Sequence, residues 1–160
     1  MSRGSLIDCR IVTLGSADAI VMYGMLRLFG EAFDEVSVYQ DAVPSERYLR
    51  DLLASDSFFA IAALQDDRVI GGLAGYALKK FEQERTEFYI YDLAVAQAFR
   101  RRGIATALIE ALRRNAAAAG AYVIFVQADV GDVPANALYD SLGKRESVLH
   151  FDIDVVRRTR

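Results

Sequence analysis

Three consecutive β-rich runs in the middle of the chain constrain the fold more than any other feature. Residues 58–64 and 68–78 are apolar and rich in β-forming side chains, and a short stretch that includes Asp66 and Asp67 separates them. Aspartates suit a tight turn, so these two runs are expected to form a β-hairpin. The stretch "KKFEQERT" then leads to a third β-rich run over residues 87–95. A β-sheet is therefore expected at the centre of the fold.

The segments before the hairpin are expected to be one strand and two helices. Residues 6–14 alternate as a strand does, and residues 16–33 carry apolar side chains at helical spacing. Pro44 and Ser45 open a second helix. The acidic stretch "DEVSVYQDAV" between the two helices is expected to be irregular.

Four further elements are expected after the third β-rich run. They are a helix over 103–119 that stops at Gly120, a buried strand over 121–129, a short helix over 134–142 and a closing strand over 144–154. The order of strands and helices predicts an α+β fold, in which a mixed sheet carries helices on both faces.

Size and charge limit the function. The chain has 160 residues, of which 53% are apolar, so it is expected to fold as one domain spanning residues 1–160. A net charge of −3 argues against binding to nucleic acid or to a membrane surface, since both need a positive field. No apolar run approaches the ~20 residues that span a bilayer, and no secretory leader is visible, so a cytoplasmic location is expected. With one cysteine, Cys9, and one histidine, His150, neither an internal disulfide nor a metal site is expected.

Three successive arginines stand immediately before a glycine and a strong helix pattern, in "RRRGIATALIE". The first turn of a helix presents unpaired N–H groups and the positive end of the helix dipole, and cations add to that field. Gly103 would let a diphosphate approach the backbone, and Ala105 keeps the next inward position small. The motif is neither the dinucleotide fingerprint nor a P-loop. The alternative is that the arginines form a solvated face.

The arginine motif resembles the acetyl-coenzyme A site of the GNAT superfamily of N-acetyltransferases. Arg100, Gly103 and Ala105 match the first signature of that family, and Asn136 and Tyr139 in "PANALYDSLG" match a second one. The resemblance implies a mostly antiparallel mixed sheet with acyl-coenzyme A in a cleft between the two central strands. It also implies that the strand segment before the arginines, Leu93–Val95, pairs with the pantetheine arm through a bulge. The cofactor-binding residues that it implies are Leu93, Ala94, Val95, Arg100, Arg101, Arg102, Gly103, Ile104, Ala105, Thr106 and Asn136.

Four longer stretches narrow the resemblance. "FEQERTEFYIYDLAV", "RRGIATALI", "GAYVIFVQADVGD" and "HFDID" together are similar to the aminoglycoside 3-N-acetyltransferases of type I, which confer resistance to gentamicin-like antibiotics. The resemblance implies direct acetyl transfer from acetyl-coenzyme A to the 3-amino group in a ternary complex. It is also compatible with a homodimer.

Asp92 and Tyr139 are the candidate catalytic residues. Asp92 lies within an apolar and aromatic strand, where an unpaired charge is costly, so a substrate ammonium is expected to compensate it, with Asp92 as general base or cation anchor. The alternative is a structural aspartate capped by backbone N–H groups. In the family the tyrosine at the Tyr139 position lies beside the sulfur, which makes it the expected proton donor to the thiolate. The alternative is a core tyrosine on an amphipathic helix.

The acceptor site is expected to be acidic, because an aminoglycoside carries several ammonium groups. Four acidic pairs are considered, at residues 34–35, at positions 82 and 84, at positions 129 and 132, and at positions 152 and 154, with a solvated surface as the alternative for each. Tyr89 and Tyr91 could pack against sugar rings, and the alternative for both is a place in the core. The candidate acceptor-binding residues are Asp34, Glu82, Tyr91, Asp129 and Asp152. His150 is expected to pack within the closing strand.

Two other functions remain open from the sequence. An acetyltransferase of the same fold that acts on a polyamine or a protein amine would keep the same cofactor loop and Tyr139. A non-catalytic module that binds acyl-coenzyme A would keep the loop alone, and the presence of Asp92 and Tyr139 argues against it.

Overall fold

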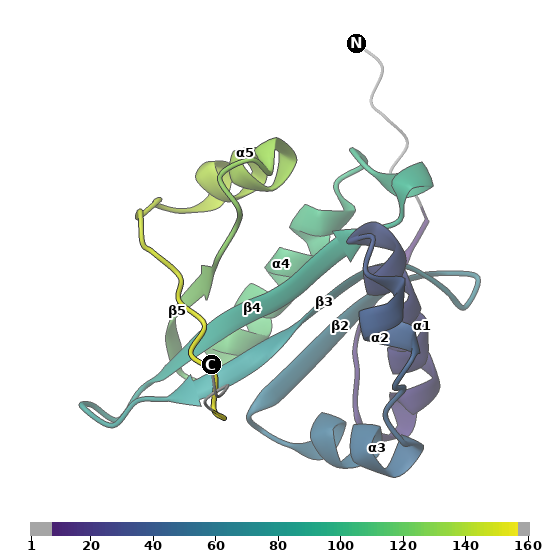
Figure 1. The fold of residues 1–160 in the computed structure, drawn as a ribbon, viewed down its shortest axis with the longest axis horizontal. Helices are drawn as coiled ribbons and strands as arrows, with labels where there is room; N and C mark the ends of the chain where they lie inside the picture. The colour runs from purple at the N-terminus through teal and green to yellow at the C-terminus, as the bar shows by residue number, and fades with distance from the viewer. Residues whose placement is uncertain (1–7, 157–160) are drawn as a thin grey trace. The chain divides into compact units, whose positions relative to one another are not determined.

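The computed structural model describes residues 8–156 of the chain (Figure 1). These residues divide into two compact units at the junction between Gln127 and Ala128. The first unit contains the sheet and most of the helices, and the second contains one helix and an extended tail.

The first unit is built on a five-stranded mixed sheet. Its strands follow the order β1-β2-β3-β4-β5, in which the first three pairs are antiparallel and β4 runs parallel to β5. The strands are β1 (Arg10–Thr13), β2 (Phe58–Gln65), β3 (Arg68–Lys79), β4 (Thr86–Val95) and β5 (Ala121–Val126). This arrangement confirms the mixed and mostly antiparallel sheet.

The expected hairpin is formed by β2 and β3. Asp66 and Asp67 occupy its turn, and both have positive φ angles, 47° and 64°. Positive φ at both central positions is the conformation that matches the right-handed twist of the flanking strands. Aspartate tolerates this conformation better than most side chains do, which is why this short turn could be predicted.

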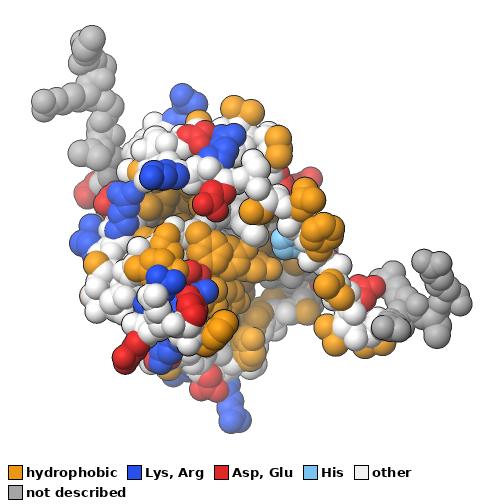
Figure 2. Space-filling model, turned by 90° about the vertical axis from the view of Figure 1, so that its left-hand side faces the viewer, with side chains coloured by type: hydrophobic (Ala, Val, Ile, Leu, Met, Phe, Trp, Pro, Cys, Tyr) orange, Lys and Arg blue, Asp and Glu red, His pale blue; other side chains and the backbone are white. Residues whose placement is uncertain are grey.

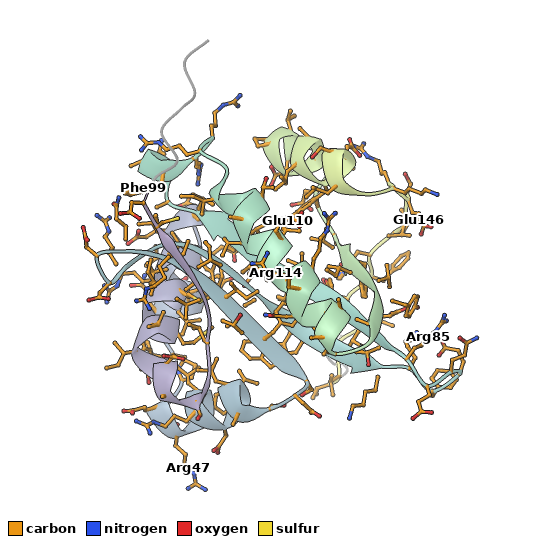
Figure 3. The ribbon with its side chains drawn as sticks, turned by 180° about the vertical axis from the view of Figure 1, so that it is seen from behind. Arg47, Arg85, Phe99, Glu110, Arg114 and Glu146 are labelled. Atoms are coloured by element: carbon orange, nitrogen blue, oxygen red, sulfur yellow. The ribbon has the colours of Figure 1, made fainter. Side chains whose placement is uncertain are left out.

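Helices cover both faces of the sheet, as expected. The helices of the first unit are α1 (Ala19–Ala32), α2 (Val36–Gln40), α3 (Glu46–Ala54) and α4 (Ile104–Ala118). Buried side chains of α1 and α3 form one core with Ala60, Ala62 and Ala74 of the sheet. Helix α4 lies behind the sheet in Figure 1 and in front of it in Figure 3.

A β-bulge interrupts the ladder between β3 and β4. Ala74 pairs with Asp92 and Gly75 pairs with Ile90, so Tyr91 is the extra residue of β4. A Cβ atom on Gly75 would lie 1.9 Å from the carbonyl oxygen of Tyr89, so only glycine allows the strands to approach this closely. The bulge brings Asp92 into the row of Ala60 and Ala74, which faces α1 and α2. The bulge therefore precedes Leu93–Val95, and the expectation of a bulge within that segment is wrong.

Three sequence expectations differ from the structure in this part of the chain. The stretch expected to be irregular contains α2, a helix of five residues that is too short to show a helical apolar repeat. Strand β5 ends at Val126 rather than at residue 129, and it is partly exposed because it pairs along one edge within the described residues. The first strand is shorter than expected, and residues 6 and 7 of that expectation lie outside the described residues.

The second unit contains the helix α5 (Val133–Leu142), as expected. Asp132 begins it by accepting a hydrogen bond from the Ala135 backbone N–H at 3.1 Å, and Pro134 lies in its first turn. The expected closing strand over 144–154 is wrong, since residues 144–156 contain neither strand nor helix. Alternating apolar residues favour an extended chain, but a strand also needs a neighbour to bond, and none pairs with this segment in the described structure.

Charged side chains of both signs share the molecular surface, and the helices are short. On the molecular face drawn in Figure 2, Lys and Arg side chains are interspersed with Asp and Glu rather than gathered into one basic patch. Between residues 8 and 156, every helix falls short of the length and apolar content that crossing a bilayer requires.

Candidate active site

The second half of β4 has one open edge. β4 pairs with β3 on both sides of the bulge residue Tyr91, but its pairing with β5 stops at Ile90 and Val126. Alternate residues of a strand direct their N–H and C=O groups toward opposite edges. Backbone groups of residues 91–95 that point away from β3 are therefore available to a ligand that lies along this edge, except the Val95 carbonyl oxygen, which accepts a hydrogen bond from Arg100.

Asp92 lies at the start of this open segment. It is partly buried, and its carboxylate Oδ2 accepts a hydrogen bond at 3.0 Å from the Tyr39 hydroxyl on α2. The donor is thus a phenol rather than the backbone N–H of a structural cap. Within residues 8–156 no Lys, Arg or His forms an ion pair with this carboxylate.

The environment of Asp92 changes its acidity. Burial raises the pKa of the Asp92 carboxyl above its ordinary value, and the nearby charge of Glu35 raises it further, whereas the hydrogen bond from Tyr39 lowers it. A partly buried carboxylate without a cationic partner attracts an ammonium group and can take a proton from it.

Aromatic rings lie beside Asp92 on the same face of the sheet. Tyr91 is 64% exposed, and its ring meets those of Tyr76 and Tyr89 edge to face, at centroid distances of 5.9 and 5.7 Å. Tyr89 stacks on Phe125 at 4.6 Å, and its hydroxyl donates to Gln127 Oε1 at 2.9 Å. Rings of this kind can pack against the apolar faces of a sugar.

The loop that follows β4 leads into α4 through two left-handed residues. Arg101 has φ 61° and Gly103 has φ 82°, and no side chain caps the helix that begins at Ile104. The first bond of the helix runs from the Ala107 N–H to the Gly103 carbonyl oxygen at 3.0 Å. The N–H groups of Ile104, Ala105 and Thr106 are therefore left without intrahelical acceptors, which suits an anion.

The three arginines of this loop have different neighbours. Arg100 Nε donates to the Val95 carbonyl oxygen at 3.0 Å, which ties the loop to the end of β4. The Arg102 guanidinium lies 5.9 Å from the centroid of the ring of Phe99, a residue labelled in Figure 3. Within the described residues none of the three forms an ion pair, so their charge is left for a ligand.

Gly103 and Ile104 indicate how a diphosphate would fit here. A Cβ atom on Gly103 would meet no protein atom within 4 Å, so packing does not require glycine at this position, whereas the positive φ does. Ile104 is 4% exposed, so its side chain belongs to the core and only its backbone faces outward. Open space, free N–H groups and unpaired cations together fit the diphosphate of a coenzyme.

Glu82 lies at the other end of β4. Its carboxylate accepts a hydrogen bond from Arg85 at 2.9 Å and lies 3.8 Å from Lys80 Nζ. Figure 3 labels Arg85 and Phe99 near opposite ends of the strand. The six steps along the strand from Thr86 to Asp92 span roughly 20 Å. The structure therefore does not bring Glu82 to Asp92, and its acceptor role stays a prediction.

The acidic turn before α2 lies closer to Asp92. Asp34 has φ 54° in the connection between α1 and α2, and Glu35 begins α2. Glu35 is the residue whose charge acts on Asp92 and on Tyr39. Tyr39 was not predicted, because a contact 53 residues along the chain leaves no local pattern. The role of Asp34 stays a prediction.

The remaining candidates lie in the second unit. The Asn136 amide donates to the carbonyl oxygens of Asp129 and Val130 at 2.9 and 3.3 Å, which closes the turn before α5. Burial and the charge of Asp132 raise the pKa of Tyr139 to about 12. The site roles of Asn136, Tyr139 and Asp129 stay predictions.

The tail of the second unit carries the last candidate. His150 Nε2 lies 3.0 Å from Asp152 Oδ1, and both side chains are exposed. The expectation that His150 packs within a strand is therefore wrong, because the strand is absent. The acceptor role of Asp152 stays a prediction. Among residues 8–156, no three His, Cys, Asp or Glu side chains converge on a point that could hold a metal ion.

Comparisons with known proteins agree on the type of domain. Residues 22–143 match the profile of the Acetyltransferase (GNAT) family. The structure is similar to that of an aminoglycoside acetyltransferase, HMB0005, from an uncultured soil metagenomic sample. The two chains are 55% identical over 94% of this chain and 100% of the other, with a TM-score of 0.92. No curated protein sequence matches the chain significantly.

Two further solved structures contain ligands. An aminoglycoside acetyltransferase, meta-AAC0020, from an uncultured soil metagenomic sample was solved in complex with sisomicin. It is 31% identical over 92% of this chain and 97% of its own, with a TM-score of 0.85. AAC(6')-Iy was solved with the bisubstrate analog CoA-S-monomethyl-acetylneamine. It is 17% identical over 91% of this chain and 98% of its own, with a TM-score of 0.70, which supports the fold alone.

Proposed function

Because the chain belongs to the GNAT acetyltransferase family, we propose that it transfers the acetyl group of acetyl-CoA to an amino group of an aminoglycoside. The proposed position is the 3-amino group of gentamicin-like compounds, by direct transfer in a ternary complex, with resistance as the result. The observation that carries the proposal is Asp92, a partly buried carboxylate without a cationic partner in the described structure, beside exposed tyrosine rings. Similarity at 55% identity to an aminoglycoside acetyltransferase supports the substrate class.

The cofactor would lie along the open edge of β4 and at the start of α4. Backbone N–H groups of Ile104, Ala105 and Thr106 would hold the diphosphate, with Arg101 and Arg102 supplying positive charge. Leu93, Ala94 and Val95 would bond the pantetheine arm, which has amide groups able to continue a strand ladder. Acetyl-CoA supplies an activated thioester. Asn136 is proposed as a further cofactor contact.

The acceptor would lie on the face of the sheet that carries Asp92. An aminoglycoside combines cationic amines with sugar rings, so Asp92 would anchor an ammonium group while Tyr91 packs against a ring. Glu35 adds a second negative charge near this place. This combination of charge and rings supports an amino sugar over a linear polyamine, which has no rings to pack.

The reaction needs two proton transfers from the nitrogen. The Asp92 carboxylate takes the first proton from the acceptor ammonium, directly or through a water molecule, and later releases it to solvent. The freed amine forms a C–N bond at the thioester carbonyl, while an N–H group of the open β4 edge donates to the developing oxyanion. The C–S bond then breaks, its electron pair stays on sulfur, and the second proton passes from nitrogen to sulfur.

Tyr139 is the proposed carrier of the second proton. With a pKa of about 12 its hydroxyl stays protonated at neutral pH. Proton donation from Tyr139 to a thiolate of pKa ~8.5 is unfavourable by about 1.4 kcal/mol for each unit by which the two pKa values differ. Tyr139 would therefore act as a relay, receiving the proton of the nitrogen as it gives its own to the sulfur.

The whole chain is proposed to be one catalytic domain. The family profile over residues 22–143 crosses the junction between Gln127 and Ala128, which supports this proposal.

A thiol-release assay with acetyl-CoA tests the function. Gentamicin, sisomicin, spermidine and a lysine peptide are compared as acceptors, and two-dimensional NMR of the product locates the acetyl group. Turnover with the two aminoglycosides and acetylation of the 3-amino group are expected. Turnover with spermidine or the peptide alone would contradict the proposed substrate, and acetylation of another nitrogen would contradict the position.

A further inference from the structure

We propose that Tyr39 is a positioning residue for acetyl transfer, whose hydroxyl holds the Asp92 carboxylate in place on the face of the sheet where the acceptor would lie. The proposal rests on the proposed function of Asp92 and adds a residue that none of the family signatures contains. It begins from the 3.0 Å hydrogen bond between the Tyr39 hydroxyl and Asp92 Oδ2. A donor at this distance fixes one carboxylate oxygen and leaves the other free to meet an ammonium group.

Helix α2 holds the Tyr39 ring in place. The ring packs against Phe29 and Phe33, each at a centroid distance of 6.1 Å, and these two phenylalanines stack on each other at 5.8 Å. Phe29 is 1% exposed, so the cluster is anchored in the core. A ring packed on two sides has few rotamers open to it, which preorganises the hydroxyl that meets Asp92.

Close approach between α1 and α2 sets the height of Tyr39 above the sheet. A Cβ atom on Gly30 would lie 3.2 Å from Tyr39 Cβ and 3.3 Å from Val36 Cα. The Glu35 N–H donates to the Gly30 carbonyl oxygen at 2.9 Å, which joins the two helices at the same place. The short helix is therefore seated on α1 with Tyr39 directed at the sheet.

The charged and titratable groups around Asp92 come from three elements. Glu35 and Tyr39 approach from α2, and tyrosines approach from β3 and β4. Glu35 opposes ionisation of Asp92, whereas the Tyr39 hydroxyl favours it by donating to the charged form. The groups that interact electrostatically with the carboxylate are Glu35, Tyr39, Tyr76 and Tyr89.

A second phenol nearby provides a comparison. Tyr23 of α1 donates at 2.8 Å to the backbone carbonyl oxygen of Pro44, which ties a loop to the helix. Both phenols line the same pocket, of about 250 Å³, between α1 and α2. One hydroxyl holds a loop and the other holds a carboxylate, so removing each in turn separates structural from electrostatic effects.

The test is a ¹³C NMR titration of the Asp92 carboxyl, assigned with Asp92→Asn, in the full-length protein. Tyr39→Phe is expected to move the titration of Asp92 to higher pH, because the charged form loses its donor. Glu35→Gln is expected to move it to lower pH, and Tyr23→Phe to leave it in place. An unchanged titration in Tyr39→Phe, or an equal shift in Tyr23→Phe, would overturn the proposal.

Kinetics supply the second readout. For Tyr39→Phe, kcat is expected to fall by about tenfold, which corresponds to loss of one hydrogen bond to a charged group. The acidic limb of its pH–rate profile is expected to move to higher pH, while the KM for acetyl-CoA stays unchanged. A rise in this KM with unchanged kcat would contradict a positioning role.

The two readouts separate this proposal from the proposed function. The NMR titration needs no substrate, so it reports on the contact between Tyr39 and Asp92 even where the acceptor is another amine. If the titration shifts in Tyr39→Phe but no aminoglycoside is acetylated, the proposed contact between Tyr39 and Asp92 holds and the proposed substrate is wrong.

Discussion

The two halves of β4 differ in the number of neighbouring strands with which they pair. Residues 86–90 pair with β3 on one side and β5 on the other, whereas residues 92–95, which follow the unpaired bulge residue Tyr91, pair with β3 alone. In the first half, Phe88 and Ile90 are buried in the core. In the second half, Asp92 is a partly buried carboxylate that accepts a hydrogen bond from Tyr39 of helix α2.

This difference shows where a sheet can hold a ligand. A strand paired on both sides has no backbone group to offer, and its side chains serve packing. After the bulge at Tyr91, the same strand still pairs with β3 along one edge, while backbone groups along its other edge are open to a ligand. Residues 86–90, the closed half of β4, thus fix the position of residues 91–95, the open half.

The largest expected effect comes from the carboxylate of the open half. Asp92→Asn is expected to lower kcat by ~10² or more, because the amide cannot take the proton of the ammonium, while affinity for coenzyme A changes little. Steady-state kinetics and calorimetry measure the two quantities. Glu87→Gln, on the closed half, is the matched control and is expected to keep kcat. Wild-type turnover in Asp92→Asn would remove this residue from the mechanism.

The next effect concerns the bulge that divides the halves. Gly75→Ala places a Cβ atom 1.9 Å from the Tyr89 carbonyl oxygen, so the strands must shift. We expect a loss of about 1–3 kcal/mol in the free energy of unfolding, measured by chemical denaturation, together with lower turnover. Gly131→Ala, where a Cβ atom meets nothing within 4 Å, is the control. Equal stability of the two variants would show that the bulge tolerates a side chain.

A smaller effect is expected from replacing the glycines at the two ends of α4. Gly103 precedes the helix and Gly120 follows it, and both have positive φ angles with open space at Cβ. Alanine at either position is expected to cost about 1 kcal/mol of unfolding free energy. In addition, Gly103→Ala is expected to raise the KM for acetyl-CoA severalfold, and Gly120→Ala to leave it unchanged. A similar KM in both variants would argue against diphosphate binding at the start of α4.

The smallest effect is on the pH dependence of stability. Folding raises the pKa of Asp92, so the folded chain binds its proton more tightly than the unfolded chain does. Stability from this group is present at low pH and is lost as pH rises from the ordinary value of 3.8 through the raised one. The unfolding free energy of the wild type relative to Asp92→Asn is expected to fall across that window and to stay level above it. Denaturation at a series of pH values measures it, and a rise across the window would contradict the burial of Asp92.

The sequence predicted those parts of the fold and of the site that carry local patterns. The aspartates of the hairpin turn, the glycine before α4 and the charged residue within an apolar strand each differ from their neighbours, although a structural alternative stayed open for Asp92 and for the arginine loop. The acetyl-transfer roles of Asp92 and of the arginine loop remain proposals.

Long-range contacts could not be predicted in the same way. The bond from Tyr39 to Asp92 joins residues 53 positions apart, and α2 is too short for periodicity. The tail at 144–154 has the alternation of a strand, but pairing depends on a neighbouring edge that the sequence does not name. Gly75 was also missed, since its reason is a carbonyl oxygen on another strand.

Amide hydrogen exchange with and without coenzyme A tests the division of β4 most directly. On binding, the account predicts added protection at residues 104–106 and at those amides of residues 91–95 that point away from β3. It predicts no change at residues 86–90, which pair with a strand on both sides. Protection that extends equally over both halves of β4, or that leaves residues 91–95 and 104–106 unchanged, would contradict it.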